Sequence, residues 1–335
     1  MKTSACFLVF LTPVACISEQ VVVEIEEEEI PISRPSDFVR EGDRYTGQVT
    51  NPTSENELSV VVDIPSGEGP WPLVVLVPGG TLSGSDSLPE VQRGEWMEAG
   101  FALATWDPDG RGESAGSENS GGQIHQDGLA AVMDATSILP VIDSNRVGLV
   151  SFSYGIVMAA GMLVRHDSPA RFLVDWEGPA SRWDTMRCAP DITPPPDAHR
   201  VELDISCEDE SYWVEREAIR AVGMLQIPYH RVQFAQDHKQ PDTEHDTQMI
   251  QAAIRGGVVE VWHNNQQVQS VDDELLLLSD QTRNQAVIRY AVERMEAVSN
   301  VRNTRGSIPA HLEDLDTRAP RTDTMDRPRR RGKRR

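Results

Sequence analysis

The segment Arg146-Val-Gly-Leu-Val-Ser-Phe-Ser-Tyr-Gly155 (RVGLVSFSYG) decides the predicted fold. Its first residues form a short apolar run, typical of a buried strand, and the Ala- and Gly-rich sequence after Ser153 predicts a helix. A sharp turn between a strand and a helix needs small residues, and serine and glycine provide them here. Such a turn exposes a serine hydroxyl at the edge of a sheet, near the positive end of the helix dipole. We therefore predict that Ser153 is a nucleophile.

The rest of the chain alternates between predicted strands and helices. Eight strands are expected near residues 44–50, 58–64, 72–78, 101–106, 146–151, 171–176, 227–234 and 258–262. Helices are expected near residues 88–99, 126–139, 154–166, 243–255 and 276–298. This alternation predicts an α/β fold whose mostly parallel, eight-stranded sheet has helices on both faces. Residues 177–226 are too many for a simple loop, so we expect a cap insertion over the carboxyl edge of the sheet.

Three motifs carry a resemblance to a known family. Ser151-Phe-Ser-Tyr-Gly155 resembles the G-x-S-x-G nucleophile elbow of the α/β hydrolases, with serine in place of the first glycine. Pro78-Gly-Gly-Thr81 is similar to the family's HGG-type oxyanion loop, with proline in place of histidine. Asp109-Gly-Arg-Gly-Glu-Ser114 is similar to its D-x-R-G-x-S segment, whose role is structural. The resemblance spans residues 43–299 and is strongest to the dienelactone-hydrolase and prolyl-oligopeptidase-like branch. It implies an oxyanion hole formed by the backbone N–H groups of Gly80 or Thr81 together with Tyr154.

A serine nucleophile needs a base and an acid that orients the base, and the family order along the chain is serine, acid, histidine. Asp237 follows the strand predicted at residues 227–234, where the family's acid commonly lies, and His263 follows the next strand. We therefore expect a triad of Ser153, Asp237 and His263. Three further residues are alternatives for the base or the acid: His245, His238 and Asp242.

The family's activity implies hydrolysis of a small-molecule carboxylic ester through an acyl-enzyme, without a cofactor. Peptidase or thioesterase activity on the same fold is an alternative. A non-catalytic surface or binding protein is the competing class, because the elbow and the oxyanion loop both depart from the family pattern. The other histidines have no spacing that predicts a metal site. Tryptophans in and beside the predicted cap are candidates for lining a substrate pocket or for packing the cap: Trp176, Trp183 and Trp213.

The two ends of the chain differ in composition from the middle. Residues 1–16 join one lysine to a short apolar run, which predicts a signal peptide, or a lipoprotein leader with a lipid anchor at Cys16. Residues 17–42 are expected to form an acidic linker, and residues 300–335 a disordered tail with a basic end. Export to the periplasm, the outer membrane or the medium would allow a disulfide between Cys188 and Cys207; two unrelated thiols are the alternative.

The net charge of the chain limits the classes of partner that it can bind. The formal net charge is −22 at pH 7, which excludes ordinary electrostatic binding of nucleic acid by the main domain. The last nine residues, Arg327 to Arg335, reverse this sign with seven basic residues, which we interpret as a solvated tail in preference to a site for an anionic partner. Nothing in the sequence predicts the oligomeric state.

Overall fold

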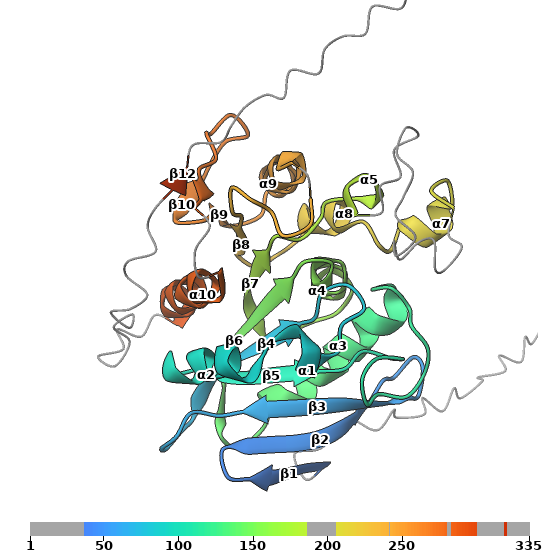
Figure 1. Cartoon of the computed structure of the whole chain (residues 1–335), viewed down its shortest axis with the longest axis vertical. Helices are drawn as coiled ribbons and strands as arrows, with labels where there is room; N and C mark the ends of the chain where they lie inside the picture. Colours follow the sequence, from blue (N-terminus) through green and yellow to red (C-terminus); the bar gives the residue numbers. More distant parts are fainter. Residues whose placement is uncertain (1–36, 186–205, 241, 280–282, 300–317, 320–335) are drawn as a thin grey trace, which may run out of the picture. The chain divides into compact units, whose positions relative to one another are not determined.

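The computed structural model contains a large, mostly parallel sheet with helices on both faces (Figure 1). The structure describes residues 37–185, 206–240, 242–279, 283–299 and 318–319. The predicted leader, most of the predicted linker and the basic end therefore lie outside the described residues. Within the described part, no helix has the length and apolar character that crossing a membrane requires.

All eight predicted strands are present, and the described residues add two more to the main sheet. The strands are β1 (Phe38–Glu41), β2 (Arg44–Thr50), β3 (Glu57–Asp63), β4 (Trp71–Val77), β5 (Ala102–Trp106), β6 (Ile142–Phe152), β7 (Ala170–Trp176), β8 (Tyr229–Val232), β9 (Val261–His263) and β10 (Gln266–Val268). Their spatial order is β1-β2-β3-β5-β4-β6-β7-β8-β9-β10. Neighbours from β5 to β9 in that order are parallel, and the remaining pairs are antiparallel.

The expected number of eight strands was therefore too low. The two additional strands, β1 and β10, form hairpins with β2 and β9 at the two edges of the sheet. Both are short and mostly polar, so they lack the apolar alternation from which strands are predicted. β1 begins within the segment expected to be linker. A separate two-stranded sheet pairs β11 (Leu277–Leu278) with β12 (Arg318–Ala319), and the latter lies within the predicted tail.

The helices divide between the two faces of the sheet. They are α1 (Gly84–Ser87), α2 (Glu90–Glu98), α3 (Gln123–Ser137), α4 (Gly155–Arg165), α5 (Arg182–Thr185), α7 (Glu210–Trp213), α8 (Ala218–Val222), α9 (Glu244–Gly256) and α10 (Arg283–Ser299). Successive side chains of β4 alternate between the faces, as the two-residue period of a strand requires. Val74 and Leu76 pack in the core beneath α2 and α10, whereas Val75 and Val77 pack in the core shared by α3, α4 and α9.

The insertion predicted at residues 177–226 is described in part and contains α5, α7 and α8. α8 contacts both α4 and α9. Arg182 donates from Nε to the Glu217 carboxylate at 2.8 Å, and its guanidinium lies 5.5 Å from the ring centre of Trp213. These contacts fix the described part of the insertion on the face of the sheet that α4 covers.

Candidate active site

The strand-to-helix turn at Ser153 has the predicted geometry. β6 ends at Phe152, α4 begins at Gly155, and Ser153 between them has a left-handed backbone with φ 51°. A residue with a side chain seldom adopts this conformation, and such strain clusters at functional sites. Gly155 is required by space, because a Cβ there would lie 2.6 Å from the carbonyl oxygen of Val77. The turn thus brings β4, β6 and α4 together around the half-buried Ser153.

The predicted oxyanion loop lies against this turn. A Cβ on Gly79 would come within 2.7 Å of the Phe152 carbonyl oxygen and 2.9 Å of the Ser153 Cβ atom. The N–H groups of Gly80, Thr81 and Tyr154 make no hydrogen bond to other described residues. They are therefore available as donors to a substrate oxygen, which is the role that the sequence predicts for them.

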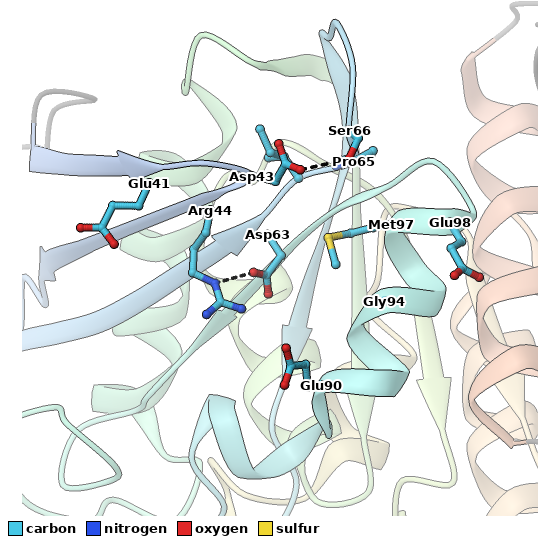
Figure 2. Close-up of a pocket in the computed structure, with 11 residues that line it drawn as sticks. Glu41, Asp43, Arg44, Asp63, Pro65, Ser66, Glu90, Gly94, Met97 and Glu98 are labelled. Atoms are coloured by element: carbon cyan, nitrogen blue, oxygen red, sulfur yellow. Dashed lines mark hydrogen bonds and ion pairs between the residues drawn. The ribbon is translucent and has the colours of Figure 1, made fainter.

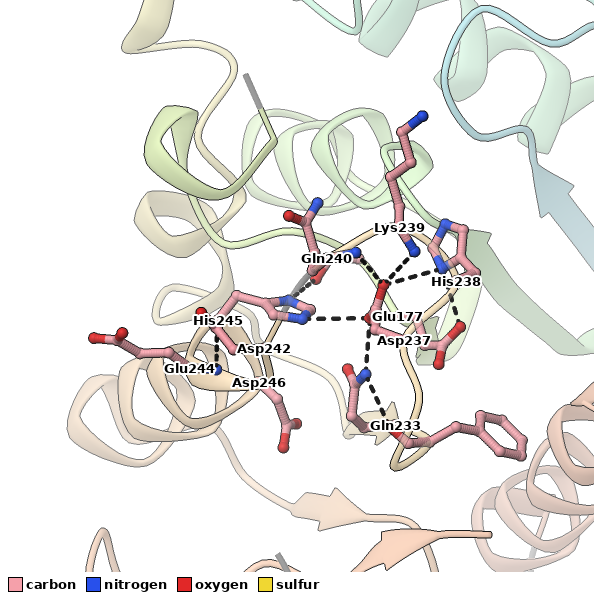
Figure 3. A network of polar contacts seen from close by, with 12 residues as sticks. Glu177, Gln233, Asp237, His238, Lys239, Gln240, Asp242, Glu244, His245 and Asp246 are labelled. Carbon is pink, nitrogen blue, oxygen red and sulfur yellow. Dashed lines mark hydrogen bonds and ion pairs between the residues drawn. The ribbon is translucent and has the colours of Figure 1, made fainter. Parts of the chain in front are cut away.

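His238, and not the predicted His263, contacts the candidate nucleophile. The Nε2 atom of His238 lies 2.8 Å from Ser153 Oγ. Its Nδ1 atom lies 3.0 Å from Glu177 Oε2 (Figure 3). With the ring proton on Nδ1, His238 donates to Glu177 and accepts from the serine hydroxyl. Ser153, Glu177 and His238 follow one another along the chain in the order that the resemblance predicts for serine, acid and histidine.

Other residues hold His238 and Glu177 in place. The ring of Phe152 lies 5.0 Å from that of His238, and Trp176 packs against Phe152 at 4.8 Å. Arg283 donates to Glu177 Oε2 and to the carbonyl oxygen of Gln236, so it joins the acid to the loop that carries His238. Glu177 is buried and, like Ser153, has a left-handed backbone, with φ 51°. The histidine side chain is 25% exposed, so substrate can reach it.

Asp237, the predicted acid, lies next to this group without being its nearest carboxylate. Its Oδ1 atom is 3.5 Å from His238 Nδ1 and accepts hydrogen bonds from the N–H groups of Lys239 and Gln240 at 2.7 Å each (Figure 3). Burial raises the pKa of Asp237, but hydrogen bonds from His245, the backbone and Gln233 outweigh it and hold the pKa well below its usual range. Asp237 is therefore ionised and shapes the loop on which His238 lies.

His263 is fully buried, and the prediction that it reaches Ser153 is wrong. Its Nε2 atom lies 3.1 Å from each carboxylate oxygen of Asp246 in α9, and Asp246 lies 3.4 Å from Arg231. The cause is the β9–β10 hairpin, which turns the chain immediately after His263 and leaves its side chain under α9. His245, an alternative for the base, is also buried and accepts a hydrogen bond from Arg231 at Nδ1.

Glu177 is not among the acids predicted from the sequence, because the sequence places it at the start of the predicted cap insertion. The signal for it was present, since Glu177 directly follows the predicted strand at residues 171–176 and therefore lies at the same sheet edge as Ser153. His238 was among the alternatives for the base. The alternative acid, Asp242, is exposed and accepts from the N–H group of Glu244, as a residue before a helix commonly does.

The three tryptophans proposed for a pocket lie in different surroundings. Trp176 packs beside the triad through Phe152, whereas Trp183 is 54% exposed. Trp213 is fully buried and donates to the carbonyl oxygen of Ser206 at 2.9 Å, so it packs the cap and lines no open pocket. Cys207 is disulfide-bonded. Its predicted partner, Cys188, lies outside the described residues.

The segment Asp109–Ser114 has the structural role that the resemblance implies. Asp109 accepts from the side-chain amides of Asn51 and Asn56 at 2.6 and 2.9 Å. Arg111 donates to both carboxylate oxygens of Glu118, at 2.7 and 2.8 Å. These contacts join the loop after β2, the loop after β5 and the segment before α3.

Figure 2 shows a pocket that lies at the edge of the sheet opposite to the edge that carries Ser153. Its volume is about 760 Å³, and five of the eleven residues that line it are acidic. They are Glu41, Asp43, Asp63, Glu90 and Glu98. Asp63 pairs with Leu103 near the amino end of β5, whereas Ser153 follows the carboxyl end of β6. The acidic pocket is therefore separate from the triad.

Solved structures share this arrangement of elements. Dipeptidyl peptidase 4 from Porphyromonas gingivalis matches with a TM-score of 0.57 and 17% identity, over 77% of this chain and 36% of that one. A puromycin-hydrolyzing peptidase from Mycobacterium tuberculosis gives 0.54 and 13%, over 78% and 46%. The α/β hydrolase GrgF from Penicillium sp. sh18 gives 0.56 and 12%, over 77% and 99%.

The chain spans less than half of the length of either peptidase. No protein-family model and no curated protein sequence matches it. The order of the strands, the turn at Ser153 and these structural matches agree, and the chain has the α/β-hydrolase fold.

Proposed function

We propose that the protein is a serine hydrolase that forms an acyl-enzyme on Ser153. One observation carries the proposal, namely the continuous contact from Ser153 Oγ through the His238 ring to the Glu177 carboxylate. A nucleophile bonded to a base that is in turn oriented by an acid is recognised by geometry and not by sequence position. The left-handed backbone of Ser153 and the adjacent oxyanion loop support the same conclusion.

In this mechanism Ser153 attacks the substrate carbonyl while His238 accepts the hydroxyl proton at Nε2. Glu177 stabilises the imidazolium that results and keeps the ring in the correct orientation. The N–H group of Tyr154, with that of Gly80 or Thr81, binds the negative oxygen of the tetrahedral intermediate. His238 then donates its proton to the leaving group, and the acyl-enzyme remains. In the second half of the reaction, His238 accepts a proton from a water molecule that attacks the acyl-enzyme, and it returns this proton to Ser153 as the carboxylic acid product leaves.

We infer that a small carboxylic ester is the substrate. Ser153 and His238 are both partly exposed, so a small substrate can reach them. A peptide is the second candidate, because two structural neighbours are described as peptidases and because His238 is placed to protonate a leaving amine. An alcohol leaves with less help from a general acid than an amine does, which favours the ester.

The proposal is tested by measuring hydrolysis of p-nitrophenyl acetate and butyrate, with an alanyl p-nitroanilide in parallel. We expect ester hydrolysis by the wild type and only background hydrolysis by Ser153→Ala. Hydrolysis of the anilide at a comparable kcat/KM would shift the assignment to a peptidase. Equal rates for the wild type and Ser153→Ala would remove the proposed function and favour a binding protein.

The disulfide at Cys207 supports the separate proposal that the protein is exported, because disulfides persist in oxidising compartments. Cell fractionation with an antibody to the protein tests it. Detection of the protein only in the cytoplasm would contradict export.

A further inference from the structure

Two carboxylates lie close to the same ring nitrogen, Nδ1, of the candidate base His238. Nδ1 of His238 lies 3.0 Å from Glu177 Oε2 and 3.5 Å from Asp237 Oδ1 (Figure 3). The ligand atoms that the three residues offer all lie within 4.8 Å of one another. A tetrahedral zinc ion with bonds of about 2.0 to 2.2 Å holds its ligand atoms about 3.3 to 3.6 Å apart. The separations at Nδ1 are close to what such an ion requires.

A second observation also points to a ligand. The Glu177 side chain is fully buried, and its Oε1 atom has no hydrogen-bond partner among the described residues. Buried polar atoms without a partner are rare, and each calls for an explanation such as an ion. Oε2, the oxygen that lies 3.0 Å from Nδ1, also accepts from Arg283, so Oε1 is the second oxygen through which the same carboxylate would complete its bond to an ion.

Charge and access agree with this assignment. The carboxylates of Glu177 and Asp237 bring two negative charges. Among the described residues, Arg283 pairs with Glu177, and His245 Nε2 lies 3.3 Å from Asp237 Oδ2. The partly exposed imidazole of His238 gives an ion a path from solvent. One imidazole nitrogen and two carboxylates, with a fourth position open to water, form a ligand set that suits Zn²⁺.

We propose that this zinc cluster, defined as Glu177, Asp237 and His238, binds Zn²⁺ reversibly and that the bound ion switches the hydrolase off. The inference rests on the proposed function. Zn²⁺ takes the lone pair of Nδ1, so the single proton of the neutral ring moves from Nδ1 to Nε2. Nε2 then donates a hydrogen bond to Ser153 Oγ and cannot accept the serine proton. The ion also occupies the carboxylate that would stabilise an imidazolium.

The binding test uses the full chain with Ser153→Ala, so that binding is measured without turnover. Isothermal titration with ZnCl₂ is expected to give one site per chain. In the same background, Glu177→Gln and Asp237→Asn are each expected to weaken zinc binding at least about tenfold, because loss of an outer-shell partner of a ligand alone costs about that much. Asp242→Asn is the matched control, since Asp242 is a nearby exposed acid outside the cluster, and its affinity should equal that of the parent.

The activity test uses the wild type. Zinc should lower ester hydrolysis to background over the concentration range in which it binds Ser153→Ala, and EDTA should restore the rate. Absence of zinc binding at millimolar ZnCl₂, or unchanged affinity in Asp237→Asn, would overturn the inference while an active wild type leaves the proposed function standing. Zinc binding to a protein that has no hydrolase activity without metal would instead overturn the proposed function and the switch with it.

Discussion

The Nε2 atom of His238 lies 2.8 Å from Ser153 Oγ, although 85 residues separate the two along the chain. The sheet explains how they meet. Ser153 follows β6, Glu177 follows β7, and His238 lies in the loop that follows β8. These three strands are neighbours in the sheet and parallel, so their carboxyl ends share one edge. One member of the proposed triad thus follows each of three adjacent strands.

The first prediction separates the two carboxylates that face His238. Glu177→Gln replaces the acceptor of the Nδ1 proton with a neutral amide, so we expect kcat for ester hydrolysis to fall by about 10⁴. Asp237→Asn should cost clearly less, because Asp237 is farther from Nδ1 and accepts hydrogen bonds from the N–H groups of its own loop and from Gln233. Steady-state kinetics of the two variants decide the matter. A larger loss in Asp237→Asn would make Asp237 the catalytic acid, as the sequence predicts.

The second prediction concerns the two small residues that flank the nucleophile. Ser151 is fully buried and its hydroxyl has no partner among the described residues, so Ser151→Ala should keep activity and raise the free energy of unfolding by about 1 kcal/mol. Gly155→Ala should lose folded protein or activity, because its Cβ would lie 2.6 Å from the carbonyl oxygen of Val77. Urea unfolding and ester hydrolysis measure both effects. A stable, fully active Gly155→Ala variant would refute the close packing at the turn.

The third prediction tests the oxyanion loop through Gly79. Gly79→Ala would force the loop away from Phe152 and Ser153. We therefore expect kcat to fall strongly, while the free energy of unfolding changes little. Gly94→Ala is the matched control, because a Cβ there meets nothing within 4 Å and the residue lies inside α2. The control should keep full activity and gain about 0.5 to 1 kcal/mol of stability. Equal kcat for the two variants would argue against a catalytic role for this loop.

The fourth prediction is a pH dependence that arises from His125 in α3. Burial, followed by the nearby Arg111 charge, lowers the pKa of His125 to about 4, compared with about 6.5 in the unfolded chain. The unfolded state therefore binds more protons between these values, and stability falls as pH decreases from about 6.5 to 4. The expected loss is about 3 kcal/mol.

His125→Gln should be less stable than the wild type at pH 7 and should lose less stability between pH 6.5 and 4.5. Urea unfolding at several pH values measures this. Carboxylates with lowered pKa, such as Asp237, begin to lose their contribution only near about pH 5, so most of the change between pH 6.5 and 5 reports on His125. Parallel curves for the two proteins would exclude His125 as the source of acid sensitivity.

The fold and the turn that carries Ser153 were predictable from the sequence because both depend on local patterns. The buried strand before Ser153 is a continuous apolar run, and the turn needs small residues within a few positions. The base could not be predicted in the same way. His238 and His263 both follow predicted strands, and the choice between them depends on the β9–β10 hairpin and on Asp246, which accepts from His263 under α9. Such long-range contacts leave no pattern in the local sequence.

The most direct test of the triad is the rate at which a fluorophosphonate reagent labels Ser153, because labelling needs an activated serine and no particular substrate. Intact mass spectrometry would compare the wild type with Ser153→Ala, His238→Ala and His263→Gln, each checked for folding by circular dichroism. The triad of Ser153, His238 and Glu177 predicts no label on Ser153→Ala, labelling of His238→Ala slowed by at least about 10³, and His263→Gln labelled at nearly the wild-type rate. Wild-type labelling of His238→Ala, or its loss in a folded His263→Gln, would contradict the account.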